Sequence, residues 1–286
     1  MTQDVKTPRD EDPAAEHPAR GAGLTLPQMK RLLTRRAVLI GAAATAVTGF
    51  AINNWKTLSE DATYQPLLDV GDVVGQRLQR LAMWNRPLAP EYRFDQLSVN
   101  HPVNGGFGAK YIDPDPAYDR MVANKFRDWQ LRIDGLVSRP TALRLSDLQA
   151  MPTRTQITMH SCDEGWSAIG QWTGVPLGWL LQFVGILPRA RYVVFHAMDK
   201  VGGQHIFDSI DLFDAFHPQT LLAHQFNGVP LPVGHGAPLR LRVELQIGYK
   251  NIKHLERIEL VDSLRDVAGG RGGFFQKFGY QWYAGQ

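Results

Sequence analysis

Cys162 is the residue of this chain whose possible chemistry is clearest from its neighbours. It is the single cysteine among 286 residues, and Asp163, Glu164 and Ser167 follow it closely. A deprotonated thiol is a soft ligand for transition metals. A lone cysteine is more often a small buried apolar residue, but carboxylates are costly neighbours for a core thiol unless they are paired. The sequence therefore favours a thiol that is offered to a ligand, with a core thiol as the alternative.

Two segments must position this thiol. Residues 155–159 read Thr-Gln-Ile-Thr-Met, which predicts a β-strand that ends just before Cys162. Residues 172–177 are expected to open an amphipathic helix that runs from Pro176 to Val184 and ends at Gly185. A tight loop at the end of a strand would present the Cys162 sulfur to a bound group.

Three further segments could line the same site. Residues 239–245 alternate apolar side chains with Arg240, Arg242 and Glu244, as in a β-strand with two different faces. Periodicity alone leaves open whether the polar face binds something or is solvated. Residues 248–253 combine backbone N–H groups with two lysines, which suits a phosphate. Residues 94–106 form an irregular segment whose glycines let the backbone approach a ligand closely, although its Asn-Gly pair also fits a plain turn.

These motifs resemble those of a known family. The pattern C-x-E-x-W-S from Cys162, followed by W-x-G-x-P-L from Trp172, is similar to the core motif of the sulfite oxidase superfamily. It is most similar to the bacterial periplasmic branch, the catalytic subunits of methionine-sulfoxide-reductase type. The resemblance extends from about Asn100 to the C-terminus. It implies that the Cys162 thiolate binds molybdenum, which is held by a single molybdopterin.

The resemblance also implies which residues bind the pterin. Arg240 matches the arginine of the family pattern N-G-A-P-x-R, although His235 stands where the family has asparagine. Imidazole can still donate one hydrogen bond in that place. Residues 248–253 resemble the family's G-F-K-x-I-K segment. The cofactor-binding residues implied in this way are Asn100, Val103, Asn104, Cys162, His235, Arg240, Asn251, Ile252 and Lys253.

The N-terminal region predicts export. Arg35 and Arg36 precede the uncharged run 37–52, which suits the apolar part of a twin-arginine signal better than a membrane-spanning helix. A buried helix behind two chance arginines is the alternative. The small residues 44–46 fit a cleavage site, but an uncleaved anchor is also open. We therefore expect a disordered leader with its signal at 1–52, one oxidoreductase domain at 53–286, and a periplasmic location.

Composition excludes several other functions. Residues 1–36 carry seven basic and five acidic side chains of a chain whose formal charge is +3, so the remainder is almost neutral and indicates no nucleic-acid partner. One cysteine permits no internal disulfide. The sequence contains no serine-hydrolase G-x-S-x-G, no Walker loop and no zinc H-E-x-x-H motif. Its scattered histidines 196, 205, 217 and 224 fit structural roles, with a place in the substrate pocket open for His205.

The fold class expected from the resemblance is α+β, a sulfite-oxidase-type molybdopterin domain with mixed sheets and no C-terminal immunoglobulin-like dimerisation domain, in a monomer. The sequence itself predicts strands at 129–135, 192–196 and 254–261 and helices at 73–84, 146–150 and 211–216. Ser146 is the expected cap of its helix. Asn227-Gly228 predicts a turn, and the aromatic C-terminal tail is expected to pack on the domain.

The activity that follows is oxygen-atom transfer at molybdenum. Asp163 and Glu164 would repel anionic sulfite, which favours a small neutral substrate such as a sulfoxide or an N-oxide. The enzyme would then be a reductase that draws electrons from a membrane haem b or quinol-linked partner, as the resemblance implies. The alternatives are sulfite oxidation, a cofactor-binding or electron-transfer module without turnover, and a structural protein that has lost the cofactor.

Overall fold

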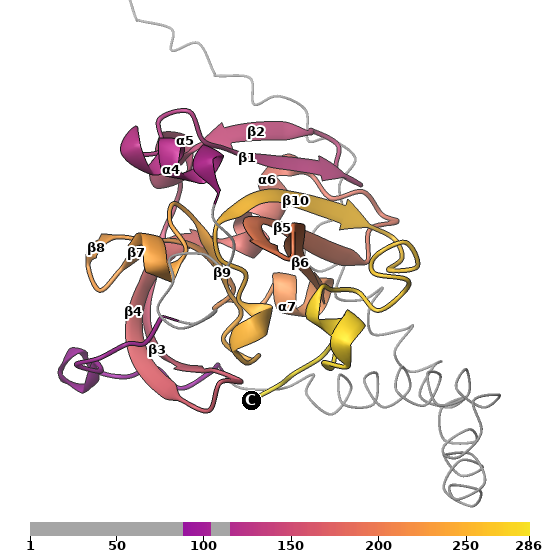
Figure 1. The fold of residues 1–286 in the computed structure, drawn as a ribbon. Coiled ribbons are helices and arrows are strands. Elements are labelled where there is room, and N and C mark those ends of the chain that lie inside the picture. Colours follow the sequence, from indigo (N-terminus) through magenta and orange to yellow (C-terminus); the bar gives the residue numbers. More distant parts are fainter. Residues whose placement is uncertain (1–87, 104–114) are drawn as a thin grey trace, which may run out of the picture.

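The computed structural model describes residues 88–103 and 115–286, which form two β-sheets with short helices around them (Figure 1). The first sheet has the strand order β2-β1-β10-β5-β6. In this sheet β1 runs parallel to β10, and all other neighbouring strands are antiparallel. The strands of this sheet are β1 (Gln130–Gly135), β2 (Thr141–Arg144), β5 (Tyr192–Val201), β6 (Gln204–Asp211) and β10 (Leu255–Val261). Strands and helices follow one another along one domain, as in an α+β fold.

The second sheet is antiparallel and carries the thiol. Its order is β3-β4-β7-β8, with β9 paired to the remaining edge of β7. The strands are β3 (Arg154–Ser161), β4 (Ser167–Pro176), β7 (Leu221–Phe226), β8 (Val229–Pro230) and β9 (Arg240–Arg242). β3 and β4 form the long curved hairpin of Figure 1, and Cys162 lies in its turn.

Short helices fill the spaces around the sheets. The α-helices are α4 (Pro116–Ala123), α5 (Leu145–Gln149), α6 (Leu177–Val184) and α7 (Leu212–Ala215). The 3₁₀ turns are η2 (Phe94–Gln96), η3 (Val233–His235), η4 (Gly248–Lys250) and η5 (Phe275–Phe278). α6 buries four apolar side chains at helical spacing against the first sheet, in a core that includes Leu131 and Phe195. Burial of this apolar stripe, rather than helix propensity, stabilises so short a helix.

The prediction that residues 172–177 open a helix was wrong. Residues 172–176 are the last part of β4, and α6 begins only at Leu177, with Pro176 as its N-cap. Side chains along β4 alternate between more and less buried positions, which is the two-residue period of a strand. The helix after Pro176 and its end at Gly185, which has a positive φ of 73°, are as predicted.

Two smaller predictions also need correction. Ser146 does not cap α5, because the helix begins at Leu145 and the Asp147 carboxylate accepts a hydrogen bond from the Arg144 N–H at 2.8 Å. The strand at 239–245 has regular pairing only over Arg240–Arg242. Neither of its faces is solvated, since Arg240 is 0% exposed and Glu244 is 2% exposed.

The remaining predicted elements within the described residues are confirmed. Strands β1, β5 and β10 and helix α7 lie where the pattern indicated, and Asn227-Gly228 forms the turn of the β7–β8 hairpin with both residues at positive φ. The tail packs on the domain, where the Ile247 N–H donates to the Ala284 carbonyl at 2.9 Å. The predicted helix at 73–84, the leader and Asn104 lie outside the described residues.

Candidate active site

The turn between β3 and β4 holds Cys162 in a fixed position. The Cys162 N–H donates to the Trp166 carbonyl at 2.8 Å, and the Gly165 N–H donates to the Cys162 carbonyl at 3.1 Å. Gly165 has a φ of +90°, a conformation that glycine adopts without strain. The turn packs against Gly248, where an added Cβ would lie 3.2 Å from the Cys162 sulfur. Glycine at 248 therefore keeps the space beside the sulfur open.

The protein alone stabilises the protonated thiol. The pKa of Cys162 is raised to about 12, mainly by burial and in part by the nearby carboxylates Asp163 and Glu164. The Cys162 sulfur lies 3.6 Å from an Asp163 oxygen. A bound metal cation reverses this preference, because it stabilises the thiolate directly. We call the exposed pair Asp163 and Glu164 the acidic mouth of the site.

Beneath the thiol lie three cationic and three histidine side chains, which we call the cationic floor. The members are Arg240, Arg242, Lys253, His101, His160 and His235. The histidine rings contact one another, with centroids 5.8 Å apart for His101 and His160 and 5.2 Å apart for His101 and His235. All six are buried or partly buried, so the floor has little water to solvate its charge.

The two arginines of the floor differ in how their charge is compensated. Both guanidinium groups lie over the Trp172 ring, at 5.0 Å for Arg240 and 4.5 Å for Arg242. Arg242 pairs with Glu244 at 2.6 Å. Arg240 donates only to the backbone carbonyls of His235, at 3.0 Å, and Asn251, and its Nε has no partner among the described residues. Burial lowers the pKa of Arg240 to about 9, as expected for a buried cation without a carboxylate.

The histidines of the floor are neutral at pH 7. Burial is the main cause that lowers the pKa of His101 to about 3 and of His235 to about 4, and that of His160 falls well below its usual value for the same reason. Arg242 donates to His160 Nδ1 at 2.6 Å, so the other nitrogen, Nε2, carries the proton. His160 Nε2, His101 Nε2 and His235 Nδ1 are buried without a partner in the described protein. Such groups are rare unless a ligand satisfies them.

The phosphate-type segment provides one side-chain cation and a rigid loop. Lys253 is 7% exposed, donates to the Gly234 carbonyl at 3.3 Å, and has a pKa lowered by burial to about 8. The Asn251 side chain binds its own loop instead of facing outward, because its Oδ1 accepts from the Val243 N–H at 2.7 Å. Ile252 is buried, and its carbonyl accepts from the Leu241 N–H. Asn251 and Ile252 therefore shape this segment, and Lys253 supplies its charge.

Asn100 and Val103 are the predicted residues of the N-terminal loop that the structure describes, and both lie near the floor. Val103 packs against Gly234, where an added Cβ would lie 3.0 Å from a Val103 methyl group. Asn100 is exposed and precedes His101, a member of the floor. The structure thus brings together segments near residues 101, 162, 235, 240 and 253. His205 is separate, and its Nδ1 contacts the Ala197 carbonyl at 2.9 Å.

Two members of the floor were missed by the sequence analysis. His160 lies two residues before Cys162 on a strand, so the two-residue period could have placed it on the same face. His101 had no comparable pattern. Its role depends on the loop that carries it across β4, where the Ile169 N–H donates to the Ser98 hydroxyl at 2.9 Å.

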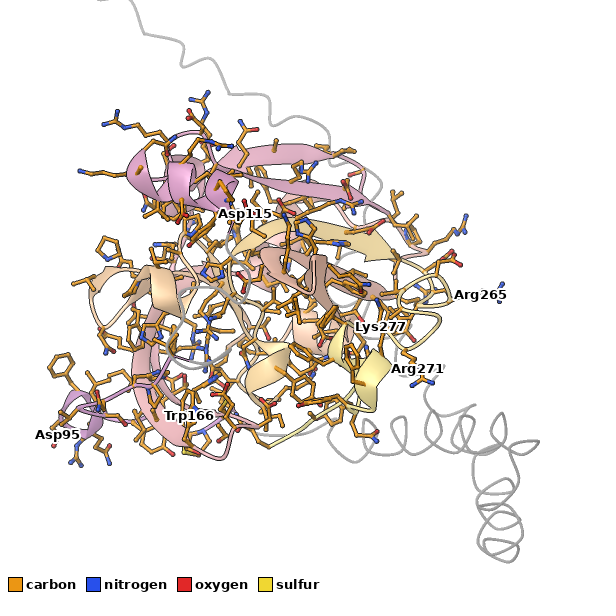
Figure 2. All side chains as sticks on the ribbon, in the orientation of Figure 1. Asp95, Asp115, Trp166, Arg265, Arg271 and Lys277 are labelled. Carbon is orange, nitrogen blue, oxygen red and sulfur yellow. The ribbon has the colours of Figure 1, made fainter. Side chains whose placement is uncertain are left out.

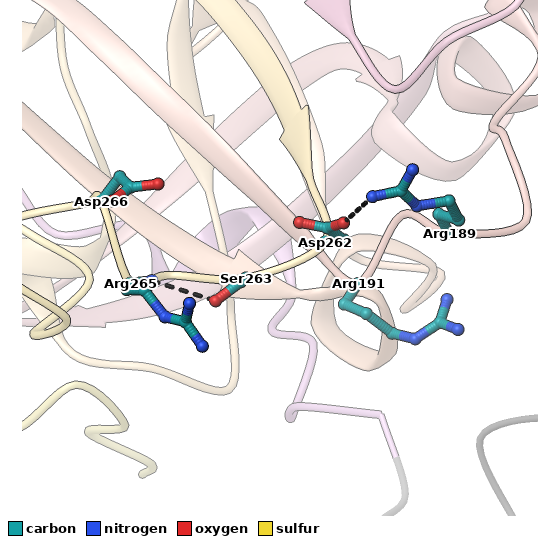
Figure 3. A pocket seen from close by; sticks show the side chains of 6 residues that line it. All are labelled: Arg189, Arg191, Asp262, Ser263, Arg265 and Asp266. Atoms are coloured by element: carbon teal, nitrogen blue, oxygen red, sulfur yellow. Dashed lines mark hydrogen bonds and ion pairs between the residues drawn. The ribbon is translucent and has the colours of Figure 1, made fainter.

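A second cleft lies elsewhere and contains side chains of both charges (Figure 3). It is lined by Arg189, Arg191, Asp262, Ser263, Arg265 and Asp266. Arg189 pairs with Asp262 at 2.6 Å. Figure 2 shows Arg265 on the opposite side of the molecule from Trp166, which belongs to the thiol turn. This cleft is therefore separate from the site of Cys162.

The residues of the floor fit an anionic, multidentate cofactor. Within the described part of the chain, Arg240 lacks a carboxylate partner and three ring nitrogens lack hydrogen-bond partners, while glycines at 236 and 248 leave room where a Cβ would collide. A group that carries phosphate and several acceptor atoms would satisfy these needs. Among residues 88–103 and 115–286 no cluster of three or more His, Cys, Asp and Glu side chains could hold a metal by itself.

Comparison with known proteins gives the family. Residues 119–267 match the family model described as the oxidoreductase molybdopterin binding domain. The chain belongs to this family, that of sulfite oxidase, and is an oxidoreductase whose domain implies a molybdenum–pterin cofactor. The resemblance found in the sequence is thereby confirmed.

Individual relatives are also similar. A putative protein-methionine-sulfoxide reductase subunit of Azospira oryzae is 32% identical over 265 residues, which cover 93% of this chain and 90% of that protein. A protein-methionine-sulfoxide reductase catalytic subunit of Xanthomonas campestris is 34% identical over 173 residues, or 57% of this chain. The match spans about half the length of that relative, 53%. The sulfane dehydrogenase SoxCD of Paracoccus pantotrophus overlaps 48% of this chain and 39% of its own, with 24% identity and a TM-score of 0.44.

Proposed function

We propose that this enzyme reduces a neutral sulfoxide at a molybdenum that is bound by the Cys162 thiolate and by one molybdopterin. The observation that carries the proposal is the contrast in charge and burial around the sulfur. Arg240 and Lys253 are buried near Cys162, whereas Asp163 and Glu164, which directly follow it, are exposed. When bound, the cofactor supplies the oxygen-atom transfer and the redox chemistry.

The floor binds the cofactor in this proposal. Arg240 supplies a buried positive charge and an unpaired Nε, and Lys253 supplies a second charge near the phosphate-type loop. His160 Nε2–H is a further donor that faces the site. Because these donors are fixed by packing before the ligand arrives, little ordering is needed on binding. Cys162 loses its proton when the metal binds.

The mouth selects the substrate. Asp163 and Glu164 raise the pKa of the Cys162 thiol, so their field reaches the position of the metal ligand. The same field disfavours sulfite, which is an anion, and leaves a neutral sulfoxide unaffected. In the reduction the S=O bond breaks, two electrons and two protons are consumed, and the products are a thioether and water. The relatives named as methionine-sulfoxide reductase subunits support this direction.

The electron donor and the location are part of the proposal. A membrane haem b or quinol-linked partner would supply the two electrons, as the family resemblance implies. Residues 1–52 would act as the leader with a twin-arginine signal to the periplasm, and 53–286 as the oxidoreductase domain. No helix within residues 88–103 and 115–286 has the length and apolar character needed to cross a membrane.

The first experiment measures molybdenum and pterin in protein that has matured through its own export route, with Cys162→Ala beside it. We expect about one metal and one pterin per wild-type chain and loss of metal in the variant. Steady-state assays with reduced viologen and a sulfoxide, and separately with sulfite and an electron acceptor, then decide the direction. Sulfite oxidation with micromolar affinity would contradict the sulfoxide proposal. Full loading without turnover of either substrate would favour a binding module.

A further inference from the structure

The C-terminal tail forms an aromatic cluster next to the thiol turn. The Tyr280 ring contacts the Tyr249 ring with centroids 5.0 Å apart and the Phe275 ring at 5.6 Å. Tyr249 directly follows Gly248, the residue that packs on Cys162. We call Tyr249, Phe275 and Tyr280 the aromatic lip. It lies beyond the cationic floor, on the same side of the sulfur as the acidic mouth.

The tail that carries the lip is fixed on both sides of Tyr280. Before it, the Gln276 side chain donates to Asp208 at 3.1 Å. After it, the Trp282 indole N–H donates to the Ser209 hydroxyl at 2.8 Å, and the Tyr249 hydroxyl donates to the Gln281 carbonyl at 2.7 Å. Figure 1 shows the C-terminal end beside the β3–β4 hairpin. Although it is 41% exposed, Tyr280 is therefore held on an ordered segment.

Tyr280 also contacts the acidic mouth. The charge of the nearby Asp163 carboxylate raises the pKa of Tyr280, and Asp163 in turn lies next to the Cys162 thiol. The position of the ring is thus defined by Tyr249 and Phe275 on one side and by Asp163 on the other. Tyr280 is also close enough to Cys162 for the charge of the thiolate to raise its pKa.

We propose that the aromatic lip binds the apolar arm of the sulfoxide and makes the enzyme selective for sulfoxides with a bulky apolar substituent. This inference rests on the proposed function. For oxygen transfer the negative oxygen of the sulfoxide would face the bound metal, so its positive sulfur would lie toward the acidic mouth. The substituents on sulfur would then lie against the lip. Aromatic rings attract both apolar groups and sulfur.

The test uses the loaded enzyme with two sulfoxides, methyl p-tolyl sulfoxide and dimethyl sulfoxide. We expect Tyr280→Ala to lower kcat/KM for the tolyl substrate about tenfold, mainly through KM, because tenfold corresponds to about 1.4 kcal/mol, which an aromatic contact can contribute. The effect on dimethyl sulfoxide should stay within about twofold by the same reasoning. Tyr280→Phe keeps the ring and should keep the preference.

Phe278→Ala is the matched control. Phe278 belongs to the same tail, is 69% exposed, and packs on Phe274 rather than on the lip. It should leave both substrates unchanged. Equal losses of kcat/KM for the two substrates in Tyr280→Ala would contradict the proposed role of the lip. The same loss of preference for the tolyl substrate in Phe278→Ala would also contradict it.

A binding measurement separates this inference from the proposed function. Methyl p-tolyl sulfone cannot be reduced in this reaction, and its affinity can be measured by calorimetry on the loaded protein. We expect about tenfold weaker binding in Tyr280→Ala, for the same aromatic contact, at unchanged molybdenum content. If the wild type reduces neither sulfoxide, the proposed function fails. The sulfone affinities alone then show whether the lip binds the apolar substituent. Equal sulfone affinities in wild type and Tyr280→Ala would refute it.

Discussion

The cationic floor and the acidic mouth both lie near the Cys162 sulfur, but they differ in burial and in how their charges are compensated. The floor is buried, and its central cation, Arg240, has no carboxylate contact within the described part of the chain. The mouth is exposed, and its carboxylates have partners, since Glu164 accepts from the Trp166 indole N–H at 3.0 Å. Buried uncompensated charge is costly and predicts an ionic ligand, whereas exposed charge acts mainly through its field. This contrast supports the proposal that the floor binds the cofactor and that the mouth selects the substrate.

The largest expected effect comes from removing the central charge of the floor. Arg240→Met should reduce bound pterin and molybdenum to less than about a tenth, because a buried ion that loses its partner typically costs 3–5 kcal/mol. The cofactor-free protein should keep or gain thermal stability, since its unpaired buried charge is gone. Metal analysis and the melting temperature of both forms test this. Arg139→Met, at a surface cation over Phe183, is the control. Normal cofactor content in Arg240→Met would contradict the role of the floor.

The second prediction concerns variants that remove the negative charge of the acidic mouth and keep its shape. In Asp163→Asn combined with Glu164→Gln, sulfite should inhibit sulfoxide reduction with an affinity about tenfold higher, if each exposed carboxylate contributes roughly 0.7 kcal/mol of repulsion. The affinity for dimethyl sulfoxide should change little. The difference should shrink in 0.5 M salt, because ions screen exposed charge. An inhibition constant for sulfite that is the same in wild type and variant would show that the mouth does not select.

The third prediction concerns His224, a histidine outside the floor that burial alone should keep neutral. Burial lowers the pKa of His224, whose ring nitrogens have no hydrogen-bond partner in the described structure. The unfolded chain gains a proton as pH falls through about 6.5, while folded His224 remains neutral until a lower pH. Stability is therefore full above pH 7 and is lost as pH falls toward 5.

His224→Leu should remove part of that loss. We expect the free energy of unfolding to fall by about 1 kcal/mol less between pH 7.5 and pH 5.0 than in wild type, after allowance for solvent screening. Urea denaturation of the loaded protein at the two pH values measures the difference. Equal losses of unfolding free energy in wild type and variant would mean that burial does not keep His224 neutral.

The smallest effect concerns how the mouth is held. Trp166→Phe removes the indole N–H that binds Glu164 but keeps an aromatic ring near His101 and His160, whose centroids lie 5.7 Å and 5.4 Å from that of Trp166. Sulfite inhibition should strengthen by about twofold to threefold, since an exposed hydrogen bond to a charged group contributes about 0.5 kcal/mol. If the inhibition constant for sulfite fell by more than in the double carboxylate variant, Trp166 would act on the floor instead.

Much of the site was predictable from local patterns. Cys162 with its following carboxylates, the strand before it, the hairpin turn at Asn227-Gly228 and the helix after Pro176 all follow from residue types and periods that act over a few positions. Local patterns failed where two periods compete. Residues 172–176 carry the Trp, Gly and Pro of a motif that was expected to open a helix, but pairing with β3 and β7 holds them in β4. Non-local pairing overrides propensity in such cases.

By itself the sequence determined the chemistry that is available: one thiol, two carboxylates beside it, and arginine, lysine and glycine in family-like order. Only the tertiary structure decided which of these groups lose their water. Residues 239–245 could have had a solvated face, and packing between β7 and the segment at 252 buried both faces and left Arg240 without a carboxylate. It also brought His101 and Tyr280 to Cys162 from distant parts of the chain. Charge and hydrogen-bonding capacity belong to residue types, whereas desolvation depends on everything that packs around them.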